Sequence, residues 1–265
     1  MNFFGDYHTH SIYSRRKYIP INHAKGTLEE NVLAAKIKGL KEVGISDHGF
    51  SHRMFGCERK KLKEIKSELN RLSQKYQIKT YLGVEANFIS LDGTIDVTDD
   101  DRKMLDIVLC GFHSSAKPKT FKEQFTIFFP NFFAKFFGTS KKLKEKNTIM
   151  VLNALEKNTI DVLTHLNRKM KCNVFEIAKK AAEKGTLIEL NEKKCDFSKE
   201  EINLILEAGA NFIVNSDSHK PKSIGDFKNV EKIIIENNIP IERIANLNKT
   251  PKFISLTNKN ITKEE

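Results

Sequence analysis

Residues 42–49, EVGISDHG, carry the pattern that decides the fold: a short run of strand-forming residues ends in polar side chains. Six further runs of this kind occur at residues 3–7 (FFGDY), 79–87 (KTYLGVEAN), 106–112 (DIVLCGF), 161–164 (DVLT), 186–191 (TLIELN) and 211–216 (NFIVNS). Longer stretches with helical spacing of apolar residues separate them. This alternation predicts parallel strands joined by crossover helices. The length of 265 residues permits a single α/β barrel, and one domain is the simplest interpretation.

Helix start and stop signals support the alternation. Thr27 with Glu30 and Ser198 with Glu201 have the spacing of capping boxes. Glycines that can end a helix in a left-handed conformation stand just before predicted strands, at Gly39, Gly185 and Gly209. The sequence therefore places helix boundaries where the strand pattern requires them.

The composition excludes several classes of protein. A hydrophobic content of 39% is sufficient for a core and excludes general disorder. The net charge of +11 indicates either an affinity for phosphate-bearing partners or only a lysine-rich background, and we favour the background. The four cysteines form no CxxC unit, which favours a reducing compartment. No export signal and no apolar run of membrane-spanning length occurs, so we expect a cytoplasmic protein without a membrane partner. The sequence leaves the oligomeric state open.

One segment interrupts the alternation of predicted strands and helices. It is an insertion at about residues 115–147 of the single domain 1–265. It contains FTIFFPNFFAKFF at residues 125–137. Its phenylalanines recur at spacings of three and four, which predicts a helix that Pro130 begins or kinks. We favour an amphipathic segment that packs its apolar face onto the barrel. A lid, a dimer contact and a membrane-surface role are the alternatives.

The predicted strands end in an unusual set of imidazoles and carboxylates. These residues are Asp6, His8, His10, Asp47, His48, Glu85, His113, His165, Asp217 and His219. In a barrel of parallel strands the carboxyl ends share one rim, where active sites are built. Imidazoles with carboxylates suit Zn, Mn or Fe(II), whereas a structural thiolate site would need clustered cysteines. The sequence therefore predicts a metal site at this rim.

Six motifs in this order resemble the PHP (polymerase and histidinol phosphatase) family. They are YHTHS at 7–11, SDHG at 46–49, GVEAN at 83–87, GFH at 111–113, THLN at 164–167 and NSDSH at 215–219. The resemblance covers nearly the whole chain and is greatest to the stand-alone bacterial phosphoesterases. It implies a single-domain distorted (β/α)7 barrel, which resembles a TIM barrel, with three divalent metal ions, Zn, Mn or Fe.

The resemblance also implies the ligands. The first ion would take His8, His10, Glu85 and Asp217; the second, Glu85, His113 and His165; the third, His23, His48 and His219. The family usually places the ligand assigned here to His23 at the position of Arg16. HAKGT at 23–27 resembles the segment that follows this ligand, so an insertion around residues 15–22 would displace it. The alternative is that Arg16 occupies the position. Catalytic roles would belong to Glu85, Asp217 and His219.

Other residues near the rim are candidates for substrate binding or for orienting the ligands. For His52 we favour a solvent-facing position, with substrate contact or proton transfer as the alternative. The phosphate-binding candidates are Arg16, Arg53, Arg59 and Arg168, of which we favour Arg59 and Arg168. Asp6, Asp47 and Asn191 are the candidates for orienting imidazoles.

The leading functional hypothesis is a phosphatase that hydrolyses a small phosphomonoester with a metal-activated water, and histidinol phosphate is a substrate suggested by the family. The second hypothesis is a nucleic-acid or nucleotide phosphodiesterase or exonuclease, motivated by the positive charge. An amidohydrolase is a third, disfavoured because such enzymes commonly bridge two metals with a modified lysine, whereas GVEAN supplies a glutamate. A non-catalytic metal-binding domain is a fourth.

Overall fold

The computed structural model describes residues 1–15 and 23–264. All seven predicted strands are confirmed, and each is parallel to the next in a sheet of order β1-β2-β3-β4-β5-β6-β7. The strands are β1 (Gly5–Thr9), β2 (Glu42–His48), β3 (Lys79–Asn87), β4 (Ile107–Gly111), β5 (Val162–Leu163), β6 (Leu187–Asn191) and β7 (Phe212–Asn215).

The sheet nearly closes on itself, because its last strand returns to its first. The His10 amide donates to the carbonyl of Ser218 at 2.8 Å, and the Ser218 amide donates to the carbonyl of His8 at 3.2 Å. These bonds continue β7 beside β1 beyond the end of the regular strand. The architecture is a single (β/α)7 barrel, as predicted.

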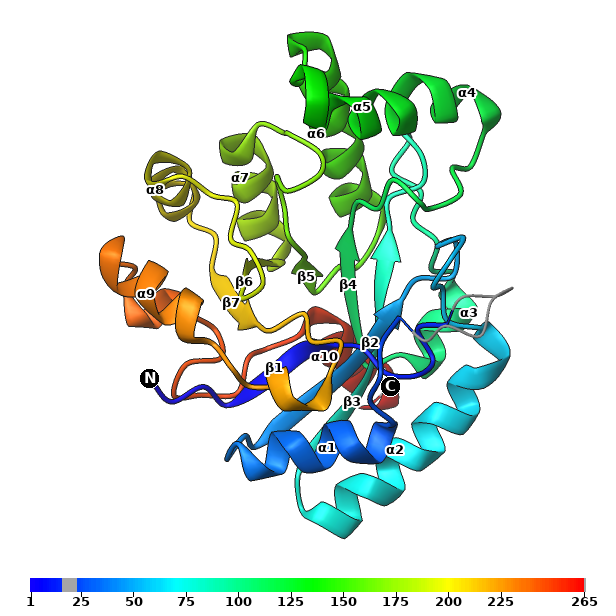
Figure 1. Ribbon diagram of the computed structural model, residues 1–265, viewed down its shortest axis with the longest axis vertical. Helices are drawn as coiled ribbons and strands as arrows, with labels where there is room; N and C mark the ends of the chain where they lie inside the picture. Colours follow the sequence, from blue (N-terminus) through cyan, green and yellow to red (C-terminus); the bar gives the residue numbers. More distant parts are fainter. Residues whose placement is uncertain (16–22, 265) are drawn as a thin grey trace.

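Helices surround the strands (Figure 1). The longer ones are α1 (Leu28–Ile37), α2 (Leu62–Tyr76), α5 (Phe129–Phe137), α6 (Lys141–Lys157), α7 (Val174–Lys184), α8 (Lys199–Glu207), α9 (Lys228–Glu236) and α10 (Ile254–Glu264). The shorter ones are α3 (Asp99–Met104), α4 (Phe121–Glu123), the π-helix η2 (Gln124–Phe128) and the 3-10 turns η1 (Arg59–Lys61), η3 (Pro221–Ser223) and η4 (Ile241–Arg243). Both predicted capping boxes are present, at the starts of α1 and α8.

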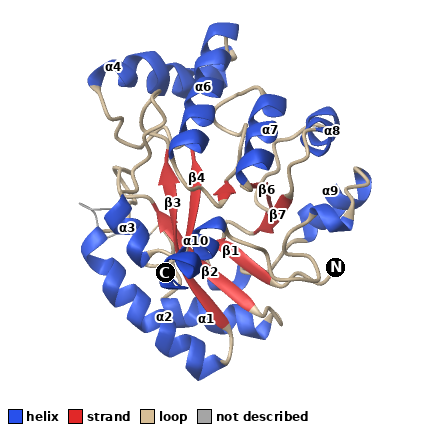
Figure 2. Ribbon diagram, turned by 180° about the vertical axis from the view of Figure 1, so that it is seen from behind, coloured by secondary structure: helices blue, strands red, loops and turns tan. Residues whose placement is uncertain are grey.

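The barrel interior is apolar at one end and polar at the other. Tyr81, Ile107, Leu187 and Ile213 form a buried cluster inside it with Phe253, which lies just before α10. Figure 2 shows α10 against the amino-terminal ends of the strands. Because side chains alternate along a strand, residues two and four positions further on face the same interior. At the carboxyl end these positions hold polar residues, so the apolar cluster is the floor beneath the site.

The Phe-rich insertion is helical, but the expectation that it packs its apolar face onto the barrel was wrong. Phe121, Phe125, Phe129, Phe132, Phe133, Phe136 and Phe137 have exposed fractions between 41% and 85%. Ile127 and Phe128 of η2 are buried, and α5 turns Asn131 inward. Asn131 and Asn147 of α6 exchange two side-chain hydrogen bonds of 2.8 and 2.9 Å. The polar face of α5 is therefore the docked face, since a buried amide pair satisfies its own donors and acceptors.

Pro130 lies in the first turn of α5. This is the position of a proline that begins a helix, which was one of the two predicted alternatives. No helix among residues 1–15 and 23–264 has both the length and the apolar character needed to cross a bilayer.

Candidate metal centre

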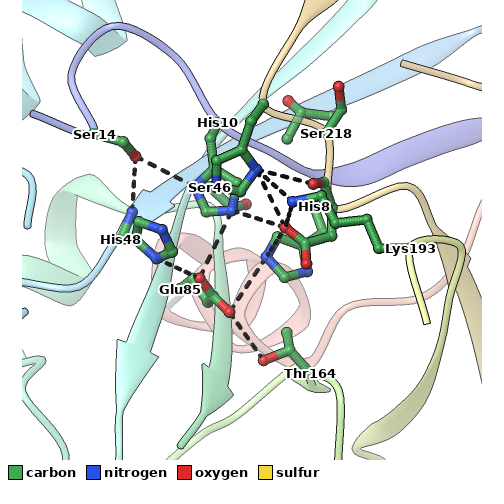
Figure 3. Close-up of polar contacts among 12 residues, drawn as sticks. His8, His10, Ser14, Ser46, His48, Glu85, Thr164, Lys193 and Ser218 are labelled. Carbon is green, nitrogen blue, oxygen red and sulfur yellow. Dashed lines mark hydrogen bonds and ion pairs between the residues drawn. The ribbon is translucent and has the colours of Figure 1, made fainter. Parts of the chain in front are cut away.

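Glu85, near the end of β3, lies at the centre of the polar rim. His165 Nε2 is 2.6 Å from Glu85 Oε1, and His48 Nδ1 is 2.7 Å from Glu85 Oε2. The imidazoles of His8 and His10 lie 3.4 and 3.7 Å from the same carboxylate (Figure 3), and that of His113 lies 3.4 Å from it. Burial alone raises the pKa of Glu85, but the surrounding imidazoles, His113 first, hold it well below its usual range. The carboxylate is therefore an anion shared by five rings.

Asp217, just beyond β7, forms a second focus beside the first. Its Oδ1 lies 3.4 Å from His10 Nε2, 3.5 Å from His219 Nδ1 and 3.9 Å from His8 Nε2. His10 and His8 thus stand between the two carboxylates, because alternate residues of β1 project to the same side.

His23 lies with this cluster, although it precedes α1 and not the end of a strand. Its ring centroid is 4.4 Å from that of His219 and 5.3 Å from that of His48. On its other side it stacks on Phe55 with the ring centroids 3.9 Å apart. Arg16, the alternative for this position, is outside the described residues. The structure therefore brings all nine residues named as ligands together.

Three overlapping sets of side chains have ligand atoms within 4.8 Å of one another: His8, His10 and Asp217; His48, Glu85 and His113; and His10, His48 and His219. The first set contains three of the four ligands expected for one ion. His48 belongs to both of the other sets, and so it lies within reach of Glu85 in one set and of His219 in the other. The expected grouping assigned His48 to the third ion alone.

Unpartnered buried atoms test whether this arrangement fits metal ions. Within residues 1–15 and 23–264, His8 Nε2, His10 Nε2, both ring nitrogens of His48 and Glu85 Oε2 are buried and have no partner in hydrogen-bond geometry, although His48 Nδ1 and Glu85 Oε2 lie 2.7 Å apart. A buried polar atom without a partner costs about 1 to 3 kcal/mol, so several of them converging on one point need an explanation. Divalent cations satisfy imidazole nitrogens and carboxylate oxygens together. The donor set therefore fits metal binding.

Two orienting residues escaped the sequence analysis. His8 Nδ1 donates to Glu189 Oε1 at 2.7 Å, and His113 Nδ1 donates to Asn87 Oδ1 at 2.9 Å. Each bond holds a proton on Nδ1 and directs Nε2 toward the centre, where it is the ring atom available to a metal ion. The available signal was the position of Glu189, a charge in the middle of the otherwise apolar β6.

The predicted orienting residues bond backbone amides, side-chain hydroxyls and a carboxylate, and Asp47 reaches an imidazole through Ser14, whose hydroxyl lies 3.3 Å from His10 Nδ1. Asp47 accepts hydrogen bonds from the Ser11 amide at 2.7 Å and the Ser14 hydroxyl at 2.6 Å, which holds the turn after His10. Asp6 accepts from two amides, one of them that of Ser216. Asn191 donates to Glu189 at 2.9 Å.

Backbone geometry at two ligand positions is unusual. His165 (φ 32) and Asp217 (φ 50) have left-handed backbone, which costs a residue other than glycine about 1 to 3 kcal/mol. Beside His165, Gly111 has no room for a larger side chain, because an added Cβ would stand 2.6 Å from the imidazole. The fold maintains these conformations to aim the two side chains.

His52 is buried, so the favoured solvent-facing position was wrong. The Phe55 amide donates to His52 Nδ1 at 3.0 Å, hence Nε2 carries the proton and donates to Ser115 Oγ at 2.7 Å. The ring stacks on His48 with centroids 4.8 Å apart. Burial, together with the nearby His48, lowers the pKa of His52 to about 3. His52 is thus a neutral ring that supports His48.

The candidate arginines separate into two groups. Arg59 donates to both carboxylate oxygens of Asp101 at 3.0 Å, which engages it in a structural ion pair away from the rim pocket. Arg53 donates to Gln124 at 3.0 Å. Arg168 does face the rim, with its guanidinium 3.7 Å from Asp217 Oδ2.

A pocket of about 230 Å³ opens over the imidazoles and the two carboxylates. Arg168, Lys169 and Lys193 line its edge. Lys193 Nζ lies 2.9 Å from Asp217 Oδ1 and 2.7 Å from His219 Nδ1. Burial and this ammonium lower the pKa of His219 to about 3, so its ring is neutral and available as a ligand. The lysines, which sequence reasoning missed, give the pocket a cationic mouth.

Comparison with known proteins agrees with this geometry. The PHP domain profile matches residues 6–242. A probable phosphatase of Shewanella pealeana is 30% identical over 96% of this chain and 92% of its own length, and one of Clostridium botulinum is 29% identical over 100% and 98%. The crystal structure of histidinol phosphate phosphatase from Lactococcus lactis, with zinc, L-histidinol and phosphate, superposes with a TM-score of 0.57 at 18% identity, covering 89% of this chain and 94% of that one. With its full motif set at one rim, this chain belongs to the PHP domain family.

Proposed function

We propose that this protein is a metal-dependent phosphatase that hydrolyses small phosphomonoesters at the rim pocket. The observation that carries the proposal is the shell of five imidazoles around Glu85, with unpartnered ring nitrogens directed inward. The names of the relatives, which are probable phosphatases, support the same chemistry.

Three divalent ions, Zn, Mn or Fe, would be held by nine residues: His8, His10, His23, His48, Glu85, His113, His165, Asp217 and His219. Bound there, such ions would supply a water of lowered pKa and positive charge for the phosphoryl oxygens. Glu85 can serve two of them because its two oxygens face different imidazoles. Burial raises the pKa of Asp217, but His8 and other nearby groups hold it well below its usual range, so it stays ionised as a ligand should.

The groups of the chain itself bind and orient the substrate. Arg168, Lys169 and Lys193 surround the pocket mouth and attract a phosphate dianion. The volume of about 230 Å³ suits a phosphoryl group with a small leaving alcohol. Histidinol phosphate, whose phosphatase in Lactococcus lactis has the same fold, is a candidate substrate.

A hydrolysis screen tests the proposal directly. Purified protein would be loaded with Zn, Mn or Fe and offered phosphomonoesters, histidinol phosphate, nucleotides and oligonucleotides. We expect release of phosphate from small monoesters. Preferential cleavage of phosphodiester bonds in nucleotides or oligonucleotides would instead support a nucleic-acid or nucleotide phosphodiesterase or exonuclease, the alternative motivated by the charge of +11.

Replacing Glu85 by Gln tests the shared carboxylate. An amide cannot bridge two cations, so we expect turnover to fall by about 1000-fold or more, with fewer ions bound per chain. Far-UV circular dichroism should be unchanged. A variant with full turnover and full metal content would refute the role of Glu85.

The third ion has its own test, because His23 and Arg16 compete for one ligand position. His23→Ala should reduce the metal content by one ion, measured by mass spectrometry, whereas Arg16→Ala should leave the content unchanged. The reverse result would assign the position to Arg16.

A further inference from the structure

A second, larger cavity of about 850 Å³ adjoins the rim pocket. Arg168 and Lys169 line both cavities, so the two spaces meet at these side chains. Its cationic lining comprises Lys135, Lys144, Arg168, Lys169, Lys171 and Lys194. Glu201 is the acidic residue found in the lining, and it already accepts a hydrogen bond from Asn167 at 2.7 Å.

Several of these cations have no acidic partner. Within residues 1–15 and 23–264, no ion pair or hydrogen bond joins the side chain of Lys144, Lys169 or Lys171 to a carboxylate. Lys194 is paired with Asp196 at 2.9 Å. Like charges gathered in one concavity repel one another and concentrate anions from solution. The lining therefore favours a ligand that carries negative charge.

The Phe-rich insertion builds one wall of this cavity. Phe132 and Lys135 come from α5 and Lys144 from α6, while Lys169 and Lys171 come from the loop after β5. The chain has no acidic residue from Gln124 to Lys144, so this wall contributes only positive charge. In Figure 1, α5 and α6 stand together beyond the ends of β4 and β5. This placement gives the insertion a function next to the catalytic rim.

We propose that the larger cavity is a second anion-binding subsite, and that the preferred substrates are small phosphomonoesters with a second phosphate at the end remote from the scissile one. The inference rests on the proposed phosphatase function and narrows its substrate class. One phosphate occupies the rim pocket while the other lies among Lys144, Lys169 and Lys171. Arg168, at the junction, contacts the connecting part of the molecule.

The experiment compares linear alkanediol monophosphates with the matching bisphosphates over a series of chain lengths. Wild-type protein should show a higher kcat/KM for bisphosphates, with an optimum length that spans the two cavities. The double variant Lys144→Ala/Lys171→Ala should lose about tenfold or more in kcat/KM for bisphosphates, the loss expected when hydrogen bonds to a charged group disappear. The ratio of bisphosphate to monophosphate activity should fall accordingly.

The double variant Lys141→Ala/Lys142→Ala is the matched control, because both lysines lie exposed on α6, outside the lining, and their loss also removes two positive charges. It should leave the ratio unchanged. Calorimetric titration with an alkane bisphosphonate gives a readout without turnover, and its Kd should rise in Lys144→Ala/Lys171→Ala but not in the control.

The phosphatase function and the second anion-binding subsite can be refuted independently. Absence of phosphate release from both the monophosphates and the bisphosphates by the metal-loaded wild-type protein would overturn the phosphatase function. Turnover without a bisphosphate preference, or with a preference that Lys141→Ala/Lys142→Ala reduces as much as Lys144→Ala/Lys171→Ala does, would overturn the subsite. A 5′-phosphorylated oligonucleotide that outcompetes every bisphosphate, and depends on Lys144 and Lys171, would also overturn it in favour of a nucleic-acid ligand.

Discussion

At the level of single side chains, the metal centre depends on groups that themselves bind no metal. Glu189 is completely enclosed, and it accepts hydrogen bonds from His8 Nδ1 at 2.7 Å and from the His165 amide at 2.8 Å. It therefore holds two expected ligands at once. Burial raises the pKa of Glu189, but His8 lowers it below its usual value, so the group is an anion.

Glu189→Gln should weaken metal binding by about 10- to 100-fold, because the amide has one accepting oxygen where the carboxylate uses one for His8 and the other for the His165 amide, and it carries no negative charge. Competition titration with a chromophoric chelator measures this affinity. Glu183→Gln, on the exposed face of α7, is the control and should match wild type. Equal affinity in both variants would show that His8 does not need Glu189.

At the level of secondary-structure elements, Asp161 fastens α10 beneath the barrel. It accepts hydrogen bonds from the Ser255 amide at 2.9 Å, the Ser255 hydroxyl at 2.6 Å and the Val108 amide at 2.8 Å. Burial nevertheless raises the pKa of Asp161 above its ordinary value. The folded state therefore binds this proton more tightly than the unfolded state does.

The stabilisation that protonated Asp161 provides is present below the unfolded pKa and is lost as the pH rises through the folded pKa. Asn has no carboxyl group to titrate, so Asp161→Asn should not show this loss. The unfolding free energy of the wild type should therefore fall relative to that of the variant as the pH rises from the unfolded to the folded pKa of Asp161. Urea denaturation at a series of pH values measures it. Hydrogen bonds to Lys119 and Thr94 lower the pKa of Asp92. Its contribution to stability is lost as the pH falls, so the unfolding free energy of the wild type should fall relative to that of Asp92→Asn at acidic pH.

The insertion offers a second test at this level, because its phenylalanines have contrasting environments. Phe128 is 1% exposed, whereas Phe133 is 50% exposed. Phe128→Ala should cost about 3 to 5 kcal/mol of unfolding free energy. Phe133→Ala should cost less than about 1 kcal/mol, since the ring already contacts water. Equal losses in urea denaturation would mean that the exposed face of α5 is covered in solution.

At the level of the whole molecule, the candidate ligands join distant parts of the chain. They come from β1, β2 and β3, from the segments after β4, β5 and β7, and from the segment before α1. Ions held there would tie most of the barrel together and stabilise the folded state by mass action. Chelation should therefore lower Tm, and added Zn or Mn should restore it. Calorimetry that finds the same Tm with and without metal would contradict such binding.

Much of this architecture can be predicted from the amino-acid sequence. The seven strands, both capping boxes and the convergence of His8, His10, Glu85 and Asp217 follow from local patterns, because strand periodicity and the shared rim of parallel strands are short-range rules. The order of the six motifs along the chain is specific enough to indicate the family from the sequence alone.

Other features depend on contacts between residues far apart in the chain. Burial of His52, the capture of Arg59 by Asp101 and the outward turn of the α5 phenylalanines arise from partners that local spacing does not reveal. For α5 the deciding contact is between Asn131 and Asn147, a buried amide pair that outweighs the apolar stripe in choosing the docked face. Periodicity indicates that a helix has two faces, but the surrounding structure determines which of them is covered.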